Sequence, residues 1–235
     1  MREDICSVPV SEVFEISDGC PMCRMRNIIE QRLLDYILGA AMMEPDVRIM
    51  TNKEGFCHRH FRMMASRHSR LPLALIIESH LAEVKKDVFG AGAVLKPSSK
   101  GKSARAQKKA QSCFICSRIE KAMGPLTETI VRLYCQQMEF REMFRKSEEL
   151  CLEHYSSLAA ETERSCDRRY KSEMQKEASY LAQNALQKLE NDINHFCSMF
   201  DYRNNTEDAD WKDSKDAIER SIQWLTGLDP QDKSF

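Results

Sequence analysis

The sequence predicts an all-α protein built from two duplicated, metal-clamped helical-hairpin modules, followed by a long helix and a short terminal helix. Three observations support this prediction. Glycine and proline are scarce, with eight and seven among 235 residues, which argues against a turn-rich β fold. The long segments are rich in Met, Leu, Glu, Lys, Gln and Ala, which are good helix formers. A C-x-x-C motif followed by a C-x-x-H motif occurs twice.

The two copies of this motif pair have nearly equal spacing. The gap between the motifs is 33 residues in the first copy and 34 in the second. Self-similarity on this scale indicates a duplicated supersecondary unit, and with an offset of 93 the intervening DVRIM also falls on EFREM. The motifs are CPMC at 20–23, CHRH at 57–60, CFIC at 113–116 and CLEH at 151–154.

A basic segment separates the two copies. Residues 90–112 contain three glycines, one proline, six Lys or Arg and no acid, which is typical of a flexible linker. The linker divides a first module at 15–89 from a second module at 113–203. Residues 204–235 are interpreted as a C-terminal helix and tail.

The first module shows helical periodicity. Residues 24–41 place apolar side chains on one stripe, and Pro45 discourages continuation of that helix. Such a helix carries the chain about 27 Å from its C-x-x-C, so we expect a shorter return segment to bring Cys57 back and form a hairpin. Another helix begins at Cys57, and residues 71–89 predict a nearly all-round apolar helix, the most buried part of the module.

The second module predicts one long helix. Residues 168–200 form an amphipathic stretch that would be about 50 Å long as a single helix. Gly124-Pro125 should kink or restart the first helix of this module.

The tail predicts a last helix. Asp213 or Ser214 is placed to cap its start, and Gly227 is placed to stop it. Apolar residues recur at helical spacing between these ends. Its apolar stripe consists of Ile218, Ile222 and Leu225.

Each motif pair supplies the ligands of a zinc site. Zn²⁺ prefers four sulfur or nitrogen ligands in a tetrahedron, and a C-x-x-C turn presents two thiolates at one corner. A C-x-x-H at the first turn of a helix adds a thiolate and an imidazole on one face. We therefore group the ligands within each copy, as Cys20, Cys23, Cys57 and His60 in one site and Cys113, Cys116, Cys151 and His154 in the other.

Two details refine the ligand set. His58 lies next to Cys57, but the second copy has Leu152 at the matching position, so the alignment selects His60. Three thiolates and one neutral imidazole leave each zinc site with a formal charge of about −1. Helix-start N–H groups and nearby arginines would offset that charge. The candidate arginines are Arg24, Arg26, Arg59 and Arg118.

Other interpretations of the motifs remain open. The cysteines of the motifs could instead be ordinary buried core residues, but their paired spacing favours the interpretation as zinc ligands. An iron–sulfur cluster is a less favoured cofactor, since such clusters usually use four cysteines in tighter runs. A thioredoxin-like C-x-x-C would need a βαβ setting, which is not predicted. A catalytic zinc normally keeps one position for water, so four protein ligands indicate a structural role.

The remaining cysteines have no duplicate partner. They are interpreted as buried or incidental thiols rather than reactive ones, although the sequence leaves their reactivity open. The histidines at 68, 80 and 195 are interpreted as helix-surface or satisfied core residues, and the methionine-rich stripes as core. The unmatched cysteines are Cys6, Cys135, Cys166 and Cys197.

Composition and termini narrow the function. A net charge of −1 and a pI near 6.6 give no global attraction to nucleic acid or anionic membrane. The first residues are acidic where a signal peptide needs a basic flank, and no apolar run spans a bilayer. We therefore expect a cytoplasmic protein without membrane association, where ten cysteines indicate metal binding or reactivity. Phosphate-loop, nucleophile-elbow and H-E-x-x-H motifs are not found, so no enzyme class is predicted.

The chain also resembles a bacterial family of unknown function that is common in clostridia-like bacteria. The resemblance covers about residues 20–227 and is carried by CPMCRMRN, DVRIMTNKEGFCHRHFRMM, LPLALIIESHL, CFIC, CLEHY and FDYRNN…WKDSKDAIERSIQWLTG. It implies that the eight Cys and His residues of the motifs are the defining positions. It implies no activity. The chain departs from the family pattern at Gly124-Pro125.

The functional prediction is a zinc-stabilised scaffold, adaptor or regulatory protein that binds another protein. The first alternative is a thiol-based sensor, in which oxidation ejects zinc and loosens the helices. The second alternative is nucleic-acid binding through the basic linker, which is less favoured because that segment has no interleaved aromatics. The oligomeric state is not predicted.

Overall fold

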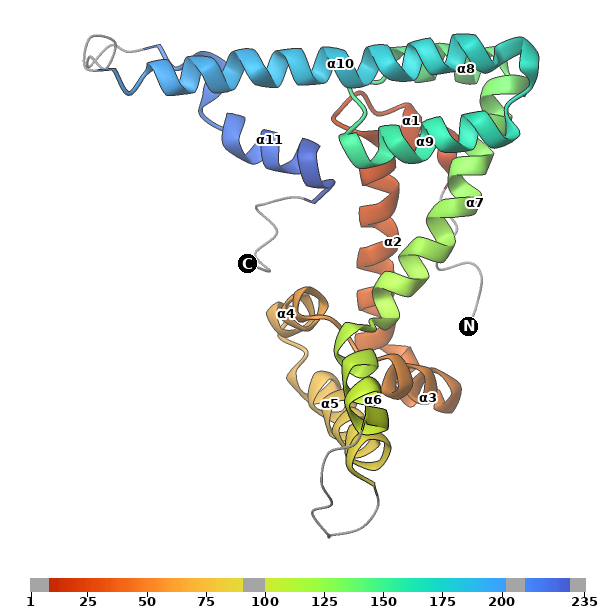
Figure 1. Cartoon of the computed structure of the whole chain (residues 1–235), viewed down its shortest axis with the longest axis vertical. Coiled ribbons are helices and arrows are strands. Elements are labelled where there is room, and N and C mark those ends of the chain that lie inside the picture. Colours follow the sequence, from red (N-terminus) through yellow and green to blue (C-terminus); the bar gives the residue numbers. More distant parts are fainter. Residues whose placement is uncertain (1–8, 91–99, 202–209, 229–235) are drawn as a thin grey trace. The chain divides into compact units, whose positions relative to one another are not determined.

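The computed structural model describes residues 9–90, 100–201 and 210–228. Within these ranges the chain forms eleven α-helices and no strand, so the predicted all-α class is confirmed (Figure 1). The helices belong to two compact units. Unit 1 takes residues 28–90 and 100–122, and unit 2 takes residues 9–27, 123–201 and 210–228.

The two units divide the chain differently from the predicted modules at 15–89 and 113–203. The division falls inside two helices, α2 (Pro21–Leu38) and α7 (Phe114–Gln136). Each of these helices begins in one unit and ends in the other. Each unit therefore combines one part of the first predicted module with one part of the second.

Unit 2 is organised around one long helix. The helix α10 (Arg168–Ser198) is continuous, as predicted, and contacts α9 and α11 (Figure 1). It buries one stripe of methionine, leucine and alanine, spaced three or four residues apart as one helix face requires. The other elements of this unit are α1 (Val10–Phe14), α8 (Met138–Lys146), α9 (Leu152–Ser165), the 3₁₀ turn η4 (Lys212–Ser214) and α11 (Ala217–Thr226).

Aromatic side chains join the helices of unit 2. The ring of Phe14 on α1 lies 5.0 Å from that of Phe140 on α8, measured between centroids. Tyr134 at the end of α7 meets Phe144 at 5.4 Å in an edge-to-face arrangement. Both geometries are favourable for aromatic pairs, and all four rings are buried. These contacts fix the N-terminal segment, which leads into Cys20, against the second half of the chain.

Unit 1 packs shorter helices around α5 (Arg70–Val84). This helix contacts α3, α4 and the π-helical turn that follows it. Among its residues only Leu73 and Ile76 are buried, while Leu71 and Leu81 are 69% and 61% exposed. The prediction of an all-round buried helix is therefore wrong, because neighbours cover only one side. The other elements of this unit are η2 (Ala40–Met43), α3 (Pro45–Glu54), α4 (His58–Ser66), η3 (Lys85–Phe89) and α6 (Lys100–Gln111).

The helix α6 corrects the predicted flexible linker at 90–112. Ala, Gln, Lys and Arg dominate the second half of that segment, and these residues favour helix. The ammonium of Lys109 lies 3.1 Å from Asp87 and donates hydrogen bonds to the carbonyls of Asn52 and Lys53. Composition alone therefore did not predict this basic helix. The first part of the linker, residues 91–99, lies outside the described residues.

The helix α7 continues through Gly124-Pro125, so the chain does not restart there. Proline removes one backbone donor inside the helix. The hydroxyl of Thr127 donates to the carbonyl of Met123 at 2.8 Å, and Thr129 donates to that of Pro125 at 2.9 Å. These side-chain hydrogen bonds add to the backbone bonds of the helix within about one turn of the proline.

The last helix is formed with a different buried face from the one predicted. Gly227 ends α11 in a left-handed conformation with a φ of 67°, as predicted. Its N-cap is Asp216, because Asp213 and Ser214 form the preceding turn η4. The described residues of α11 bury Ala217 and Trp224. The predicted stripe is exposed by 43%, 41% and 56% at Ile218, Ile222 and Leu225, respectively.

In the described part of the chain, no helix combines the length and the apolarity that crossing a membrane requires.

Candidate metal centres

The eight predicted ligands come together in two groups, but with their partners exchanged. The grouping within each sequence copy is wrong, because each C-x-x-C meets the C-x-x-H of the other copy. In each group, the four candidate ligand atoms lie within 4.8 Å of one another. Centre A consists of Cys20, Cys23, Cys151 and His154, and centre B consists of Cys57, His60, Cys113 and Cys116. Centre A lies in unit 2 and centre B in unit 1.

The exchange follows from the path of the chain after α2. The predicted hairpin needs the segment after α2 to run back to Cys20, but α3 packs on α5 instead. The chain thus reaches Cys57 while still beside the second half of α2, where Glu30 contacts His60. Cys57 and His60 consequently meet the second C-x-x-C.

Helix starts position all the ligands. Cys57 and Cys151 are the N-caps of α4 and α9, and both adopt extended backbone angles. Cys20 and Cys113 directly precede α2 and α7. The second ligand of each motif lies three residues later, in the first helical turn, and therefore on the same face. Two helix N-termini, which carry partial positive charge, thus point at each group of thiols.

The geometry of centre B fits a tetrahedral zinc ion. Zinc bonds of about 2.3 Å to sulfur and about 2.0 Å to nitrogen imply tetrahedron edges of about 3.8 Å between sulfurs and about 3.6 Å from sulfur to nitrogen. The Sγ atoms of Cys57 and Cys116 are 3.9 Å apart. The Nδ1 atom of His60 lies 3.1, 3.2 and 3.5 Å from the Sγ atoms of Cys57, Cys113 and Cys116, respectively.

Centre A has the same geometry. The Sγ atoms of Cys23 and Cys151 are 3.5 Å apart. The Nδ1 atom of His154 lies 3.6, 3.2 and 3.1 Å from the Sγ atoms of Cys20, Cys23 and Cys151, respectively. In both centres the same imidazole nitrogen faces three sulfurs, so both present the donor set of a closed Cys₃His site.

A buried carboxylate orients the imidazole of centre B. The Nε2 atom of His60 lies 2.9 Å from Glu30, whose side chain is 1% exposed. Arg59 donates two hydrogen bonds, of 2.7 and 2.9 Å, to the same carboxylate. A carboxylate on the outer nitrogen fixes the ring and leaves Nδ1 free for a metal. Glu30 was not among the predicted site residues, although an acid next to Ile29 on the apolar side of α2 was a usable signal.

A turn attaches the start of α7 to centre B. The N–H of Phe114 donates to the carbonyl of Gly55 at 2.8 Å. Ser117 and Arg118 both donate hydrogen bonds to the carboxylate of Glu54. The arginine also lies 4.3 Å from the centroid of the Phe114 ring. These contacts bring the second C-x-x-C to Cys57.

A different set of contacts supports centre A. The N–H of Gly19 donates to the carboxylate of Glu148 at 2.9 Å. Gly19 directly precedes the C-x-x-C motif of this centre, and Glu148 lies shortly before its C-x-x-H motif. Arg24 donates hydrogen bonds to the carbonyls of the segment before Cys20, including that of Val13 at 3.0 Å. The indole N–H of Trp224 donates to the carbonyl of Leu150 at 3.0 Å. The helix α11 is therefore part of the support of this centre.

The thiols of centre A differ in pKa. Burial opposes ionisation of Cys20, yet hydrogen bonds from Cys151 and Cys23 and interaction with His154 hold the pKa of this thiol well below its usual range. Hydrogen bonds to Cys151 and Cys20, together with burial, raise the pKa of Cys23. Burial lowers the pKa of His154, but hydrogen bonds to Cys151 and Cys20 outweigh it and raise that pKa to about 10. A divalent cation would replace such shared protons.

The thiols of centre B differ in the same way. Hydrogen bonds from Cys113 and Cys116 lower the pKa of the Cys57 thiol despite its partial burial. Hydrogen bonds with Cys113 and Cys57 raise the pKa of Cys116. Burial lowers the pKa of His60, but its bonds to the thiols and to Glu30 outweigh burial and raise that pKa to about 11.

The two centres differ in exposure. All four ligands of centre A are buried, whereas Cys116 of centre B is exposed and Cys57 is half-buried. Of the two neighbouring histidines, His60 is buried within centre B and His58 is exposed, which agrees with the prediction of His60 as the ligand. Of the unmatched cysteines, Cys197 is exposed and Cys6 lies outside the described residues.

We expect a chelator to remove metal from centre B before centre A, because a competing ligand reaches exposed sulfur more easily. Metal release monitored with a colorimetric chelator should show two phases. Alkylation of samples quenched between the phases should label Cys57, Cys113 and Cys116 but not Cys151. Labelling of Cys151 in the first phase would contradict the expected order.

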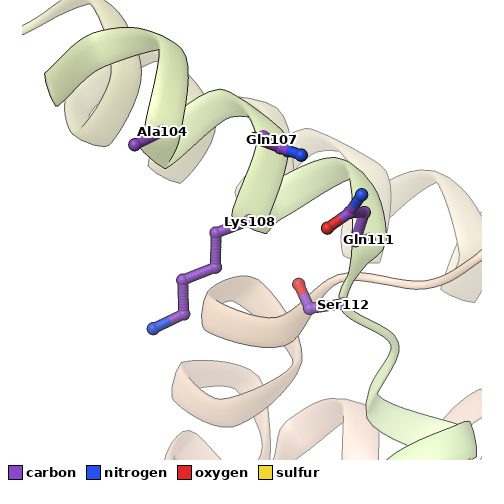
Figure 2. Close-up of a pocket in the computed structure, with 5 residues that line it drawn as sticks. All are labelled: Ala104, Gln107, Lys108, Gln111 and Ser112. Atoms are coloured by element: carbon purple, nitrogen blue, oxygen red, sulfur yellow. The ribbon is translucent and has the colours of Figure 1, made fainter. Parts of the chain in front are cut away.

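A shallow groove lies along α6. It has a volume of about 520 Å³. Figure 2 shows Lys108 extending from the helix and Ser112 at the point where the helix ends. The groove is lined by Ala104, Gln107, Lys108, Gln111 and Ser112, and the one charged side chain among these residues is that of Lys108.

Together, the fold and the two groups define an all-α protein with two Cys₃His clusters placed to hold metal ions. The chain belongs to a family of unknown function, DUF6062, whose model matches residues 1–232. No curated protein and no solved structure matches the chain.

Proposed function

We propose that both centres hold zinc and that the ions stabilise the two helical units. The observation that carries this proposal is the meeting of three sulfurs and one Nδ1 in each unit, within 4.8 Å of one another. Sulfur and imidazole ligands in this geometry favour zinc. Four protein ligands fill the coordination shell of each ion, which supports a structural role rather than a catalytic one.

Protein purified without added metal should contain about two zinc ions per chain and be colourless. Mass spectrometry of the intact protein under native conditions and elemental analysis measure the metal content, and an absorption spectrum detects iron–sulfur centres, which absorb visible light. The control is the same protein after denaturation and chelation, which should contain no metal. Visible absorption with iron in the sample would overturn the assignment to zinc.

We further propose that the stabilised fold serves as a scaffold or adaptor for another protein. A protein whose metals are structural acts through its surface, and α11 offers an exposed apolar stripe on a helix that is anchored by Trp224. A scaffold role is consistent with that surface. The bacterial origin and the C-terminal segment as a family signature stay predictions.

A photo-crosslinking amino acid at Ile222, introduced in the organism of origin, should capture one defined partner protein. The matched control position is Gln183, an exposed polar residue of α10. Capture at position 222 but not at 183 supports the adaptor role. Equal capture at both positions, or no capture, would remove the support that α11 gives to it.

Nucleic-acid binding is the second candidate, and one observation favours it. The helix α6 carries no acid, and its exposed residues include Arg105 and Lys108, of which Lys108 lines the groove. A titration with mixed DNA and RNA at low salt tests this candidate, since phosphate contacts weaken as salt rises. Absence of binding at low salt would remove it.

A further inference from the structure

Two cysteines outside the metal centres lie in contact with each other. Cys135 is in the last turn of α7, and Cys166 is the C-cap of α9. They are 31 residues apart in sequence, yet their Sγ atoms are 3.3 Å apart. Both belong to unit 2, and neither is a member of centre A.

The separation is suited to a covalent bond. A disulfide needs an S–S distance of about 2.0 Å, so the two sulfurs must approach by about 1.3 Å. Cys135 is half-buried and Cys166 is buried, so an oxidant in solution reaches Cys135 first. Burial and the hydrogen bond with Cys135 also raise the pKa of Cys166 to about 12, so the less accessible thiol is also the less readily ionised one. The two cysteines therefore differ in the way that an attacking and a resolving thiol differ.

We propose that Cys135 and Cys166 are a redox modification site that forms a reversible disulfide on reaction with a hydroperoxide. The thiolate of Cys135 attacks one oxygen of hydrogen peroxide, the O–O bond breaks, and the departing hydroxide takes a proton to become water. Cys135 is then a sulfenic acid. The sulfur of Cys166 attacks it, gives up its proton and expels a second water. Two thiols are oxidised to one disulfide as one peroxide is reduced to two waters.

The disulfide closes a loop that contains all of α8 and α9 and two ligands of centre A, Cys151 and His154. A cross-link over such a loop reduces the freedom of the unfolded chain. After oxidation, metal loss from centre A that proceeds through unfolding of this loop should therefore be slower by about tenfold or more. This consequence rests on the proposed zinc site, whereas formation of the disulfide does not.

The test treats the purified full-length protein with a small molar excess of hydrogen peroxide, blocks free thiols with N-ethylmaleimide and digests with trypsin. The expected product is Leu133–Arg141 linked to Ser165–Arg168, and it should disappear on reduction. The matched control is Cys197→Ser, which removes an exposed cysteine and should leave the product unchanged. Cys135→Ser should abolish the product and leave Cys166 alkylated.

The outcomes separate the two proposals. If the linked peptide forms in protein that contains no zinc, the disulfide proposal stands and only the zinc assignment is overturned. Recovery of Cys135 and Cys166 as separate alkylated or over-oxidised peptides would overturn the disulfide, whatever the metal content. Linkage of either cysteine to Cys197 or to a ligand of centre A, in place of the expected product, would also overturn it.

Discussion

Cys23→Ser should remove one metal ion and make Cys151, but not Cys57, reactive toward alkylation. Cys23 shares centre A with Cys20, Cys151 and His154, so the serine leaves an incomplete ligand set there. A structural zinc ion contributes about 10 kcal/mol or more to folding at neutral pH. This contribution equals or exceeds the free energy of unfolding of many domains, so unit 2 of the variant should lose much of its helicity.

The measurement is mass spectrometry of thiols labelled under native conditions, with metal content determined on the same sample. In the Cys23→Ser protein, Cys20 and Cys151 should be labelled, while Cys57 and Cys113 should stay protected by the intact centre B. Cys197→Ser is the control, because this exposed residue belongs to neither centre.

The reciprocal variant completes the test. Cys116→Ser should expose Cys57 and Cys113 and leave Cys151 protected. Pairing of motifs within each sequence copy predicts the opposite, with Cys57 exposed by the change at Cys23 and Cys151 exposed by the change at Cys116. That opposite result would show that the exchanged centres are not formed in solution.

The ligand residues could be predicted because their chemistry is written in short local motifs. A C-x-x-C or C-x-x-H at a helix start places both side chains on one face whatever the rest of the chain does. Which motif meets which could not be predicted in the same way. Either C-x-x-C can complete a Cys₃His set with either C-x-x-H. The nearly equal spacing in the two copies therefore does not distinguish pairing within a copy from pairing between copies. The Gly55–Phe114 hydrogen bond and the Glu54 contacts decide the outcome, and these are tertiary.

The same limit explains the errors on α5 and α11. Periodicity identifies apolar positions, but burial also needs a neighbour on that side. Leu81 of α5 is apolar and exposed, whereas Trp224 is buried on a face of α11 that the predicted stripe did not include. The long helix α10 was predicted well because one stripe of small and apolar residues continues through it and meets α9 and α11. The internal duplication itself remains a prediction, although in both copies a helix begins at the second residue of each motif.

Glu30→Leu should weaken metal binding at centre B by about 10- to 100-fold, the range found when a carboxylate that orients a ligating histidine is removed. The leucine cannot accept the hydrogen bond from Nε2 of His60, and it leaves the guanidinium of Arg59 without this partner. Glu30→Gln keeps an acceptor oxygen of nearly the same shape, so we expect a smaller loss. The graded order, wild type above Gln above Leu, distinguishes orientation of the ring from a general packing defect.

Competition with a chelator of known affinity measures this loss, and centre A in the same molecules is the internal control. Centre A does not contain Glu30, and the aligned position in the second copy is Met123, which offers no carboxylate to His154. Affinity at centre A should therefore stay unchanged while that at centre B falls. Equal loss at both centres would indicate global destabilisation, and unchanged affinity at centre B in the Leu variant would show that the carboxylate does not orient His60. Either result would remove Glu30 as the residue that makes the two centres unequal.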